Sequence, residues 1–194
     1  MTEYIKHLTS EGYAYIPGEY YKALDKIYGS GERDYLQELK NGYNNLILDP
    51  YSLGNRWRGY AQFRRLEDGT LIFGHFTPYK QTKKYNPDTG DIVRNYPLLP
   101  NSITENSILQ SLLKDDEDVV FVHLINASSN MLGGDSIIAS TPKKIEKVLH
   151  LEKPFDTLVV NHDKYHAVTP VGCSINGEIA IRDIILVTFH KING

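Results

Sequence analysis

The chain has 194 residues, enough for one domain with a sizeable core and too few for two ordinary domains. Hydrophobic residues make up 41% of it and charged residues 23%, a profile typical of globular proteins. The formal net charge of −3, with basic residues scattered along the chain, favours neither a nucleic-acid partner nor a membrane surface. With one cysteine and no apolar run at the start, we expect a soluble cytoplasmic protein without an intrachain disulfide.

The N-terminal part of the chain has a helical character. Residues 18–48 mix tyrosine, leucine and charged residues, a pattern that predicts one or two helices broken at glycines. We therefore expect residues 1–50 to form a helical N-terminal part.

The chain from 55 to 96 is expected to form strands and hairpins. Near period-two alternation from Arg56 to Phe63 predicts a strand. The dipeptide Asp68-Gly69 predicts a hairpin turn before a second strand at 70–73. A short strand over 92–96 follows, and then a short helix over 101–113.

The last eighty residues have the clearest strand patterns, and 114–190 is the predicted core of the fold. Strands are predicted at 119–125, 136–140, 158–160, 165–169 and 179–189, the last being the longest. The dipeptide Thr141-Pro142 resembles a helix start, and apolar residues up to Leu149 follow at helical spacing. Many short strands with few helices predict a mainly β fold with flanking helices, a sandwich or barrel, in a single domain over 1–194.

The same region contains residues that suit a metal site. A catalytic non-haem iron site needs two imidazoles and one carboxylate, with other coordination positions left open. His166 lies on a strand that leaves a turn, although a hydrogen-bonded structural histidine would give the same pattern. Asp115 lies in an acidic run that a solvated loop would also explain. The candidate ligands are Asp115, Asp116, His123, Asp135, His162, Asp163 and His166.

Arg182 is unusual because it lies inside an apolar strand. Alternation places it on one face with Ile184, Leu186 and Thr188. A buried arginine requires an anion, and the neighbouring Asp183 lies on the opposite face. A bound dicarboxylate is therefore one hypothesis and a structural ion pair is the other.

Six segments together resemble the bacterial 2-oxoglutarate/Fe(II)-dependent dioxygenases that hydroxylate free amino acids: 114–126, 133–135, 138–139, 157–159, 166–170 and 182–189. Shorter segments at 56–60 and 85–94 resemble the same family. The resemblance implies a double-stranded β-helix, a jelly-roll or cupin-like barrel. It also implies Fe(II), 2-oxoglutarate as cosubstrate and a free L-amino acid as substrate.

The resemblance also implies roles for individual residues. Asp115 and His166 match two of the three iron ligands, and Arg182 matches the arginine that binds the far carboxylate of 2-oxoglutarate. Leu113 stands at the place of the first histidine ligand and cannot bind a metal. Relatives have several dozen more residues at the same place, so one deletion would explain both departures. His123 and His162 are the two candidate replacements for the lost ligand, and we favour neither.

Two functions stay open on these residues. The chain is either a dioxygenase with a degenerate metal site, or a pseudoenzyme that binds 2-oxoglutarate or an amino acid or acts as a partner subunit. A sequence shortened from an active parent is a third reading. Arg56, Arg58 and Tyr60 are candidate substrate contacts because an amino acid brings a carboxylate, although cation–π stacking explains them equally well. The sequence leaves the oligomeric state open and is compatible with a homo-oligomer.

Overall fold

The structure of this chain is a computed structural model. It describes residues 2–21, 34–52, 54–83, 87–113 and 119–189. The chain divides into two compact units, 1–36 with 115–194 and 37–114, and each is described here by itself. The single-domain organisation over 1–194 stays a prediction.

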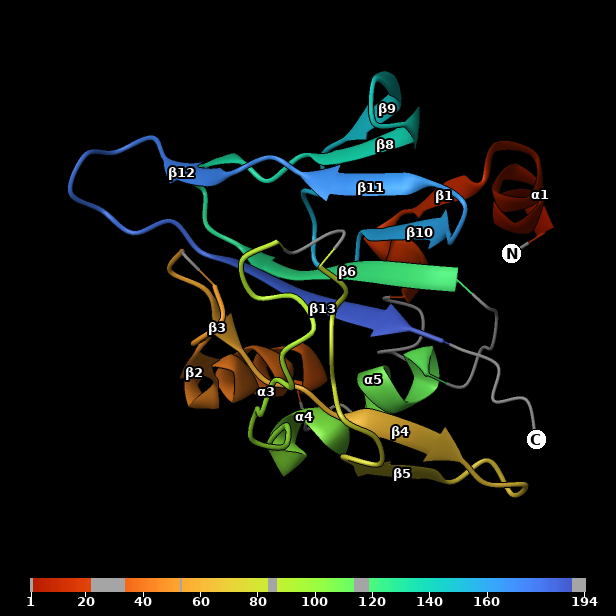
Figure 1. Ribbon diagram of the computed structural model, residues 1–194, viewed down its shortest axis with the longest axis vertical. Helices are drawn as coiled ribbons and strands as arrows, with labels where there is room; N and C mark the ends of the chain where they lie inside the picture. The colour runs from red at the N-terminus through yellow and green to blue at the C-terminus, as the bar shows by residue number, and fades with distance from the viewer. Residues whose placement is uncertain (1, 22–33, 53, 84–86, 114–118, 190–194) are drawn as a thin grey trace. The chain divides into compact units, whose positions relative to one another are not determined.

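A four-stranded antiparallel sheet forms the centre of the first unit, with the strand order β1-β10-β6-β13 (Figure 1). Its strands are β1 (Tyr13–Ile16), β10 (Thr157–Asn161), β6 (Val119–Ala127) and β13 (Arg182–Thr188). The nearly continuous apolar run of β6 is explained by its central position, where both faces of the strand are covered. With nine residues β6 is longer than β13, so the prediction that the last strand is the longest is wrong.

A second layer of strands lies beside this sheet in Figure 1. It contains a three-stranded sheet of order β11-β8-β9 and a two-stranded ribbon of β12 and β7. The strands are β7 (Met131–Gly133), β8 (Ser136–Thr141), β9 (Lys144–Leu149), β11 (Tyr165–Val168) and β12 (Val171–Cys173).

The two faces of β6 belong to two different core clusters. Val122 and Leu124 pack between the layers in an inner cluster, whose other buried members are Ile138, Leu151, Leu158 and Val160. Val119 faces the other way and joins an outer cluster with Leu8, Ala14 and Val159, beside helix α1 (Thr2–Glu11). The period of two along the strand thus separates an interior face from an outer face.

The predicted helix after Thr141 is wrong, because Lys144–Leu149 form strand β9. This strand pairs with β8 in a hairpin, with Val148 opposite Ile137. Ile145 and Val148 are 61% and 53% exposed, so the spacing that suggested a helix marks no buried face. Strand pairing with β8 overrides the local helical pattern.

The N-terminal part is less helical than predicted, since β1 lies between α1 and α3 (Tyr35–Gly42). Much of the predicted helical region, residues 22–33, lies outside the described residues. No helix in the described ranges is long and apolar enough to cross a membrane.

The second unit holds short elements. They are η1 (Tyr43–Asn45), β2 (Ile47–Leu48), β3 (Trp57–Arg58), β4 (Gln62–Arg65), β5 (Leu71–Gly74), α4 (Asn101–Thr104) and α5 (Ser107–Leu112). The predicted hairpin is confirmed: Arg65 pairs with Leu71, and Gly69 adopts a φ of 82° in the turn. Residues 92–96 form no strand, which corrects that prediction. The helix predicted over 101–113 is two short helices, because the Asn106 side chain accepts a hydrogen bond from the N–H of Ile108 and starts a new helix.

Candidate functional site

His166 and Arg182 both face the interior between the two layers of the first unit. His166 on β11 is directly opposite Ile138, a fully buried member of the inner cluster. Arg182 on β13 is opposite Ala127, which packs against the same cluster. Directly opposite residues of an antiparallel pair share a face of the sheet. The strands therefore direct both side chains into one interior space.

A β-bulge explains how Arg182 and Ala127 come to share this face. The register between β6 and β13 shifts between Asp183 and Ile184, where Ile125 of β6 has no partner on β13. The extra residue reverses the alternation of β6 but leaves that of β13 unchanged. Arg182 thus stays on the same face as Ile184, as the sequence predicts.

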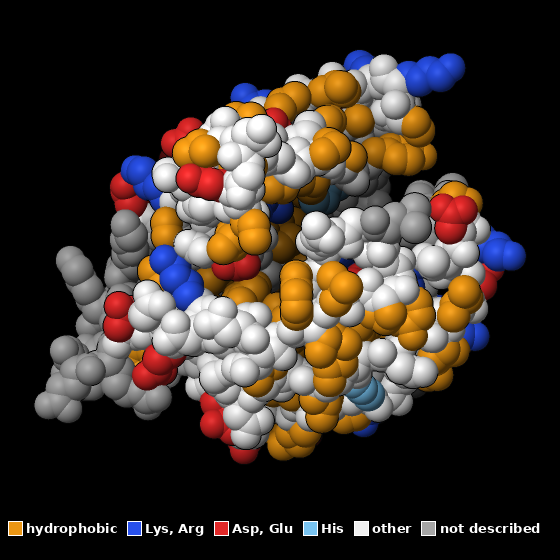
Figure 2. Space-filling view, turned by 90° about the vertical axis from the view of Figure 1, so that its left-hand side faces the viewer, with side chains coloured by type: hydrophobic (Ala, Val, Ile, Leu, Met, Phe, Trp, Pro, Cys, Tyr) orange, Lys and Arg blue, Asp and Glu red, His pale blue; other side chains and the backbone are white. Residues whose placement is uncertain are grey.

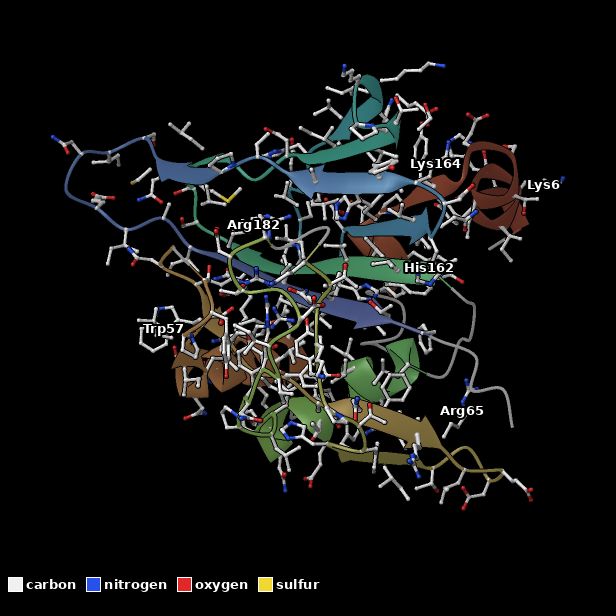
Figure 3. The ribbon with its side chains drawn as sticks, viewed as in Figure 1. Lys6, Trp57, Arg65, His162, Lys164 and Arg182 are labelled. Carbon is white, nitrogen blue, oxygen red and sulfur yellow. The ribbon has the colours of Figure 1, made fainter. Side chains whose placement is uncertain are left out.

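Three interior nitrogen atoms of these two side chains have no hydrogen-bond partner in the part of the chain that the structure describes. The Nε2 atom of His166 and the Nε and Nη2 atoms of Arg182 are buried, and no described residue forms a hydrogen bond with them. Figure 3 labels Arg182 at the start of β13. Buried polar atoms are normally paired, and a carboxylate at Arg182 and an electron-pair acceptor at His166 would satisfy these three atoms.

Electrostatics favour the same interpretation. Burial lowers the pKa of His166, and the charge of Arg182 lowers it further. The imidazole is therefore neutral near pH 7, the form that binds a metal ion. Burial also lowers the pKa of Arg182, and the nearby carboxylate of Asp135 acts against this effect.

The turn before β8 packs against the side chain of Arg182. Gly134 has a φ of 75° and lies so close that a Cβ there would stand 2.9 Å from Cδ of Arg182. The next residue, Asp135, is fixed by His150 Nδ1 at 2.8 Å and by the Thr169 hydroxyl at 3.2 Å. The hydrogen bond with His150 lowers the pKa of Asp135, which keeps this carboxylate ionised beside Arg182.

Ser136 is a further candidate that sequence reasoning missed. Its side chain is fully buried, and its Oγ has no hydrogen-bond partner among the described residues. It lies two residues before Ile138 on β8 and therefore faces the same interior. A polar residue in phase with buried apolar ones was the signal that could have identified it.

His123 does not belong to this interior. It is opposite Thr157 and Ile185 on the outer face of the central sheet, where its ring stacks on Phe121 at 5.8 Å. Its Nδ1 lies 2.7 Å from the Thr157 hydroxyl. Burial lowers the pKa of His123 to about 3. The sheet itself separates His123 from His166, so His123 is a structural histidine.

The other predicted ligands divide into exposed and undescribed residues. His162 and Asp163 are exposed at the turn between β10 and β11, and Figure 3 shows His162 well apart from Arg182. Asp115 and Asp116 lie outside the described residues. In the described ranges no three His, Cys, Asp or Glu side chains are grouped closely enough to hold a metal ion. Of Asp115 and His166, the two iron ligands that the resemblance implies, the structure describes only His166.

Leu113, at the position of the first ligand, is a buried residue of the second unit. It is 3% exposed, and its N–H donates to the Leu109 carbonyl at 3.0 Å, which continues the last turn of α5. Leucine is therefore an ordinary packing residue at this position.

The candidate substrate residues lie in the second unit. Arg58 donates to the Tyr79 hydroxyl at 2.8 Å and lies over the rings of Tyr79 and Tyr96. Tyr60 stacks on Tyr79 with ring centroids 4.3 Å apart. Arg56 is different, because it lines a cavity. Its Nε atom lies 3.9 Å from Oδ2 of Asp49, which is a loose ion pair. The structure engages Arg58 and Tyr60 in an aromatic cluster and leaves Arg56 accessible.

The chain resembles known proteins over most of its length. A family model described as "2OG-Fe dioxygenase" matches residues 40–116 and 114–188. The chain is 52% identical to the 3(1)-hydroxy-L-isoleucine 4-dioxygenase of Pantoea ananatis, over 98% of this chain and 96% of that protein. It is 31% identical to the L-isoleucine-4-hydroxylase of Bacillus thuringiensis, over 79% of this chain and 82% of the relative.

Solved structures show the same fold. The crystal structure of IDO from Bacillus thuringiensis matches with a TM-score of 0.74 and 25% identity, over 96% of this chain and 93% of that one. A BsmA homologue from Methylobium petroleophilum also gives a TM-score of 0.74, at 16% identity, over 96% of this chain and 91% of that one. The predicted double-stranded β-helix is confirmed.

The comparisons also locate the shortened part of the chain. The two matches to the family model meet at 114–116, directly after Leu113. The match with the Pantoea relative runs over 238 residues, whereas this chain has 194, so several dozen positions have no counterpart here. Both observations agree with the predicted deletion beside Leu113.

Proposed function

The chain belongs to the 2OG-Fe dioxygenase family, which uses Fe(II) and 2-oxoglutarate, and on that premise we propose that it hydroxylates a free L-amino acid. The observation that carries the proposal is the pair of interior side chains with unpartnered atoms, His166 and Arg182. They supply one metal ligand and one carboxylate-binding group in one enclosed space. Iron in this family supplies the oxidation of a C–H bond.

Each residue has a defined task in this proposal. Arg182 binds the far carboxylate of 2-oxoglutarate with its Nε and Nη2 atoms, in the two-pronged geometry that guanidinium favours. The neutral His166 offers the Nε2 electron pair to the metal, and Asp115 offers a carboxylate. Gly134 and Asp135 keep the arginine in place.

The proposed substrate is an amino acid of the isoleucine type, on the strength of the two relatives' names. Its carboxylate would bind an arginine of the second unit, with Arg56 the best placed of the predicted contacts. The lone cysteine, Cys173, suits the cytoplasmic location that we also propose.

Binding of 2-oxoglutarate tests the cosubstrate half of the site. Isothermal titration calorimetry should show 2-oxoglutarate binding to the wild-type chain, and a loss of affinity of about thirtyfold or more in Arg182→Gln, because a buried charged partner is removed. Arg65→Gln, a change on the exposed β4–β5 hairpin, should bind like the wild type. Equal affinities in Arg182→Gln and wild type would disprove this role of Arg182.

Iron binding tests the metal half. Anaerobic Fe(II) with 2-oxoglutarate should give a weak visible charge-transfer band that His166→Ala abolishes. The variant Leu113→His, which restores the family's ligand type, should strengthen the band. A wild-type chain that binds 2-oxoglutarate without any band would contradict turnover and favour the pseudoenzyme.

A further inference from the structure

The second unit contains a cavity of about 320 Å³ whose lining includes Arg56, the substrate contact proposed above. This volume is at the lower end of the range for small-molecule sites, so it suits a ligand of amino-acid size. Its lining includes Arg56, Arg94, Asp49, Asp88, Gln81 and Tyr51. Two guanidinium groups and two carboxylates therefore surround one small space.

Arg94 is the group in this cavity that points to a ligand. Arg94 is only 6% exposed, yet its buried Nε atom has no hydrogen-bond partner among the described residues. The Nη2 atom donates to the Thr89 hydroxyl at 2.8 Å, and the guanidinium lies 5.6 Å from the Tyr51 ring centre. The side chain is thus held in place, while its Nε donor has no hydrogen-bond partner among the described residues.

The hydrogen bonds of Asp49 go to residues other than the two arginines. Asp49 uses Oδ1 to accept hydrogen bonds from the Tyr51 N–H at 2.9 Å and from the Tyr96 hydroxyl at 2.8 Å. Its Oδ2 stays 3.9 Å from Nε of Arg56, which is too long for a hydrogen bond. Arg56 is 55% exposed and keeps donors for another anion.

We propose that this cavity is a binding site for a free α-amino acid, whose carboxylate is bound by Arg94 and Arg56 and whose ammonium group is bound at the rim by Asp88. The buried Nε of Arg94 provides a fixed donor, and Arg56 supplies a second positive group from a more exposed position. Asp88 is exposed and lines the same cavity, so its carboxylate is available for a cation. The choice of ligand rests on the proposed function, whereas the site itself requires neither iron nor 2-oxoglutarate.

Calorimetry with L-isoleucine and the full chain, free of iron and 2-oxoglutarate, tests this site. The wild type should bind, and Arg94→Gln and Arg56→Gln should each weaken binding by about thirtyfold or more, as expected for loss of a charged partner. Arg65→Gln should leave the affinity unchanged. Because Arg94 is buried, Arg94→Lys provides a milder variant, and its affinity should lie between those of wild type and Arg94→Gln.

Ligand analogues give a test that needs no variant. The methyl ester of L-isoleucine, which lacks the free carboxylate, should bind the wild type much more weakly than L-isoleucine does. N-acetyl-L-isoleucine, which lacks the ammonium group assigned to Asp88, should also bind more weakly than L-isoleucine. Full affinity for the ester would overturn the assignment, as would an absence of L-isoleucine binding to the iron-free chain. Neither result would affect the binding of 2-oxoglutarate at Arg182, so failure of this site and failure of the proposed function remain distinguishable.

Discussion

Gly134 lies directly against the side chain of Arg182: a Cβ on this glycine would stand 2.9 Å from Cδ and 3.1 Å from Nε of the arginine. The glycine also has a φ of 75°, which other residues rarely adopt. Position 134 therefore determines where the guanidinium can lie.

Gly134→Ala should displace Arg182 and weaken 2-oxoglutarate binding by about tenfold, the cost of one distorted charged hydrogen bond. Calorimetry on the purified variant measures this. Gly172→Ala is a matched control, because its Cβ would meet Leu132 at an ordinary 4.0 Å. Wild-type affinity in Gly134→Ala would show that the arginine tolerates the methyl group.

Ser136 offers a test with opposite signs for stability and binding. Its buried hydroxyl has no described partner, so Ser136→Ala should leave the free energy of unfolding unchanged or raise it by about 1 kcal/mol. If the hydroxyl binds cosubstrate, 2-oxoglutarate affinity should fall by about tenfold in the same variant. Urea unfolding and calorimetry measure the two quantities, with Ser140→Ala on the same strand as control. A loss of stability without loss of affinity would make Ser136 a structural residue only.

His123 should make the stability of the first unit depend on pH. Its pKa of about 3 lies far below the ordinary value of 6.5, so between these values the unfolded chain binds a proton that the folded chain excludes. The contribution of the neutral ring is complete above about pH 6.5 and falls by about 1.4 kcal/mol per pH unit below it, down to about pH 3. His123→Gln should reduce this slope in urea unfolding at pH 7 and pH 5, whereas His162→Gln in the exposed turn should keep it. An unchanged slope in His123→Gln would contradict the assignment.

The inner cluster should dominate the stability of the first unit. Leu124 is fully buried in it, so Leu124→Ala should lower the free energy of unfolding by about 2–5 kcal/mol. Val148 on β9 is 53% exposed, so Val148→Ala should change the free energy of unfolding by no more than about 0.5 kcal/mol. If urea unfolding shows that Val148→Ala lowers the free energy of unfolding as much as Leu124→Ala does, Val148 is packed more tightly than its exposure indicates. Figure 2 shows that exposed apolar side chains are widespread on one face, so Val148 is not exceptional.

Sequence-based prediction succeeded where a feature of the fold leaves a local pattern in the sequence. The apolar run of β6 and the Asp68-Gly69 turn each have a local cause, burial on both faces and a left-handed glycine, and both predictions are confirmed. β9 was misread because Ile145 and Val148 fit a helical spacing by chance, while pairing with β8 decides the conformation. Such pairing is a tertiary effect that a local window does not contain.

For the site, alternation placed Arg182 correctly, although the bulge that aligns it with Ala127 leaves no sign in the sequence. Ser136 was within reach of the same reasoning. The unpartnered Nε of Arg94 was not, because it depends on loop residues brought together from separate parts of the second unit.

The central sheet has a kinetic consequence for this protein. Tyr13 at the start of β1 pairs with Val160 in β10, a residue roughly 150 positions further along the chain, and such distant pairings are slow to form. During synthesis β1 cannot pair with β10 until residues 157–161 have left the ribosome. Until then the apolar residues that α1 and β1 contribute to the outer cluster remain exposed. Exposed apolar surface promotes aggregation, so we expect a chaperone to help most at this stage.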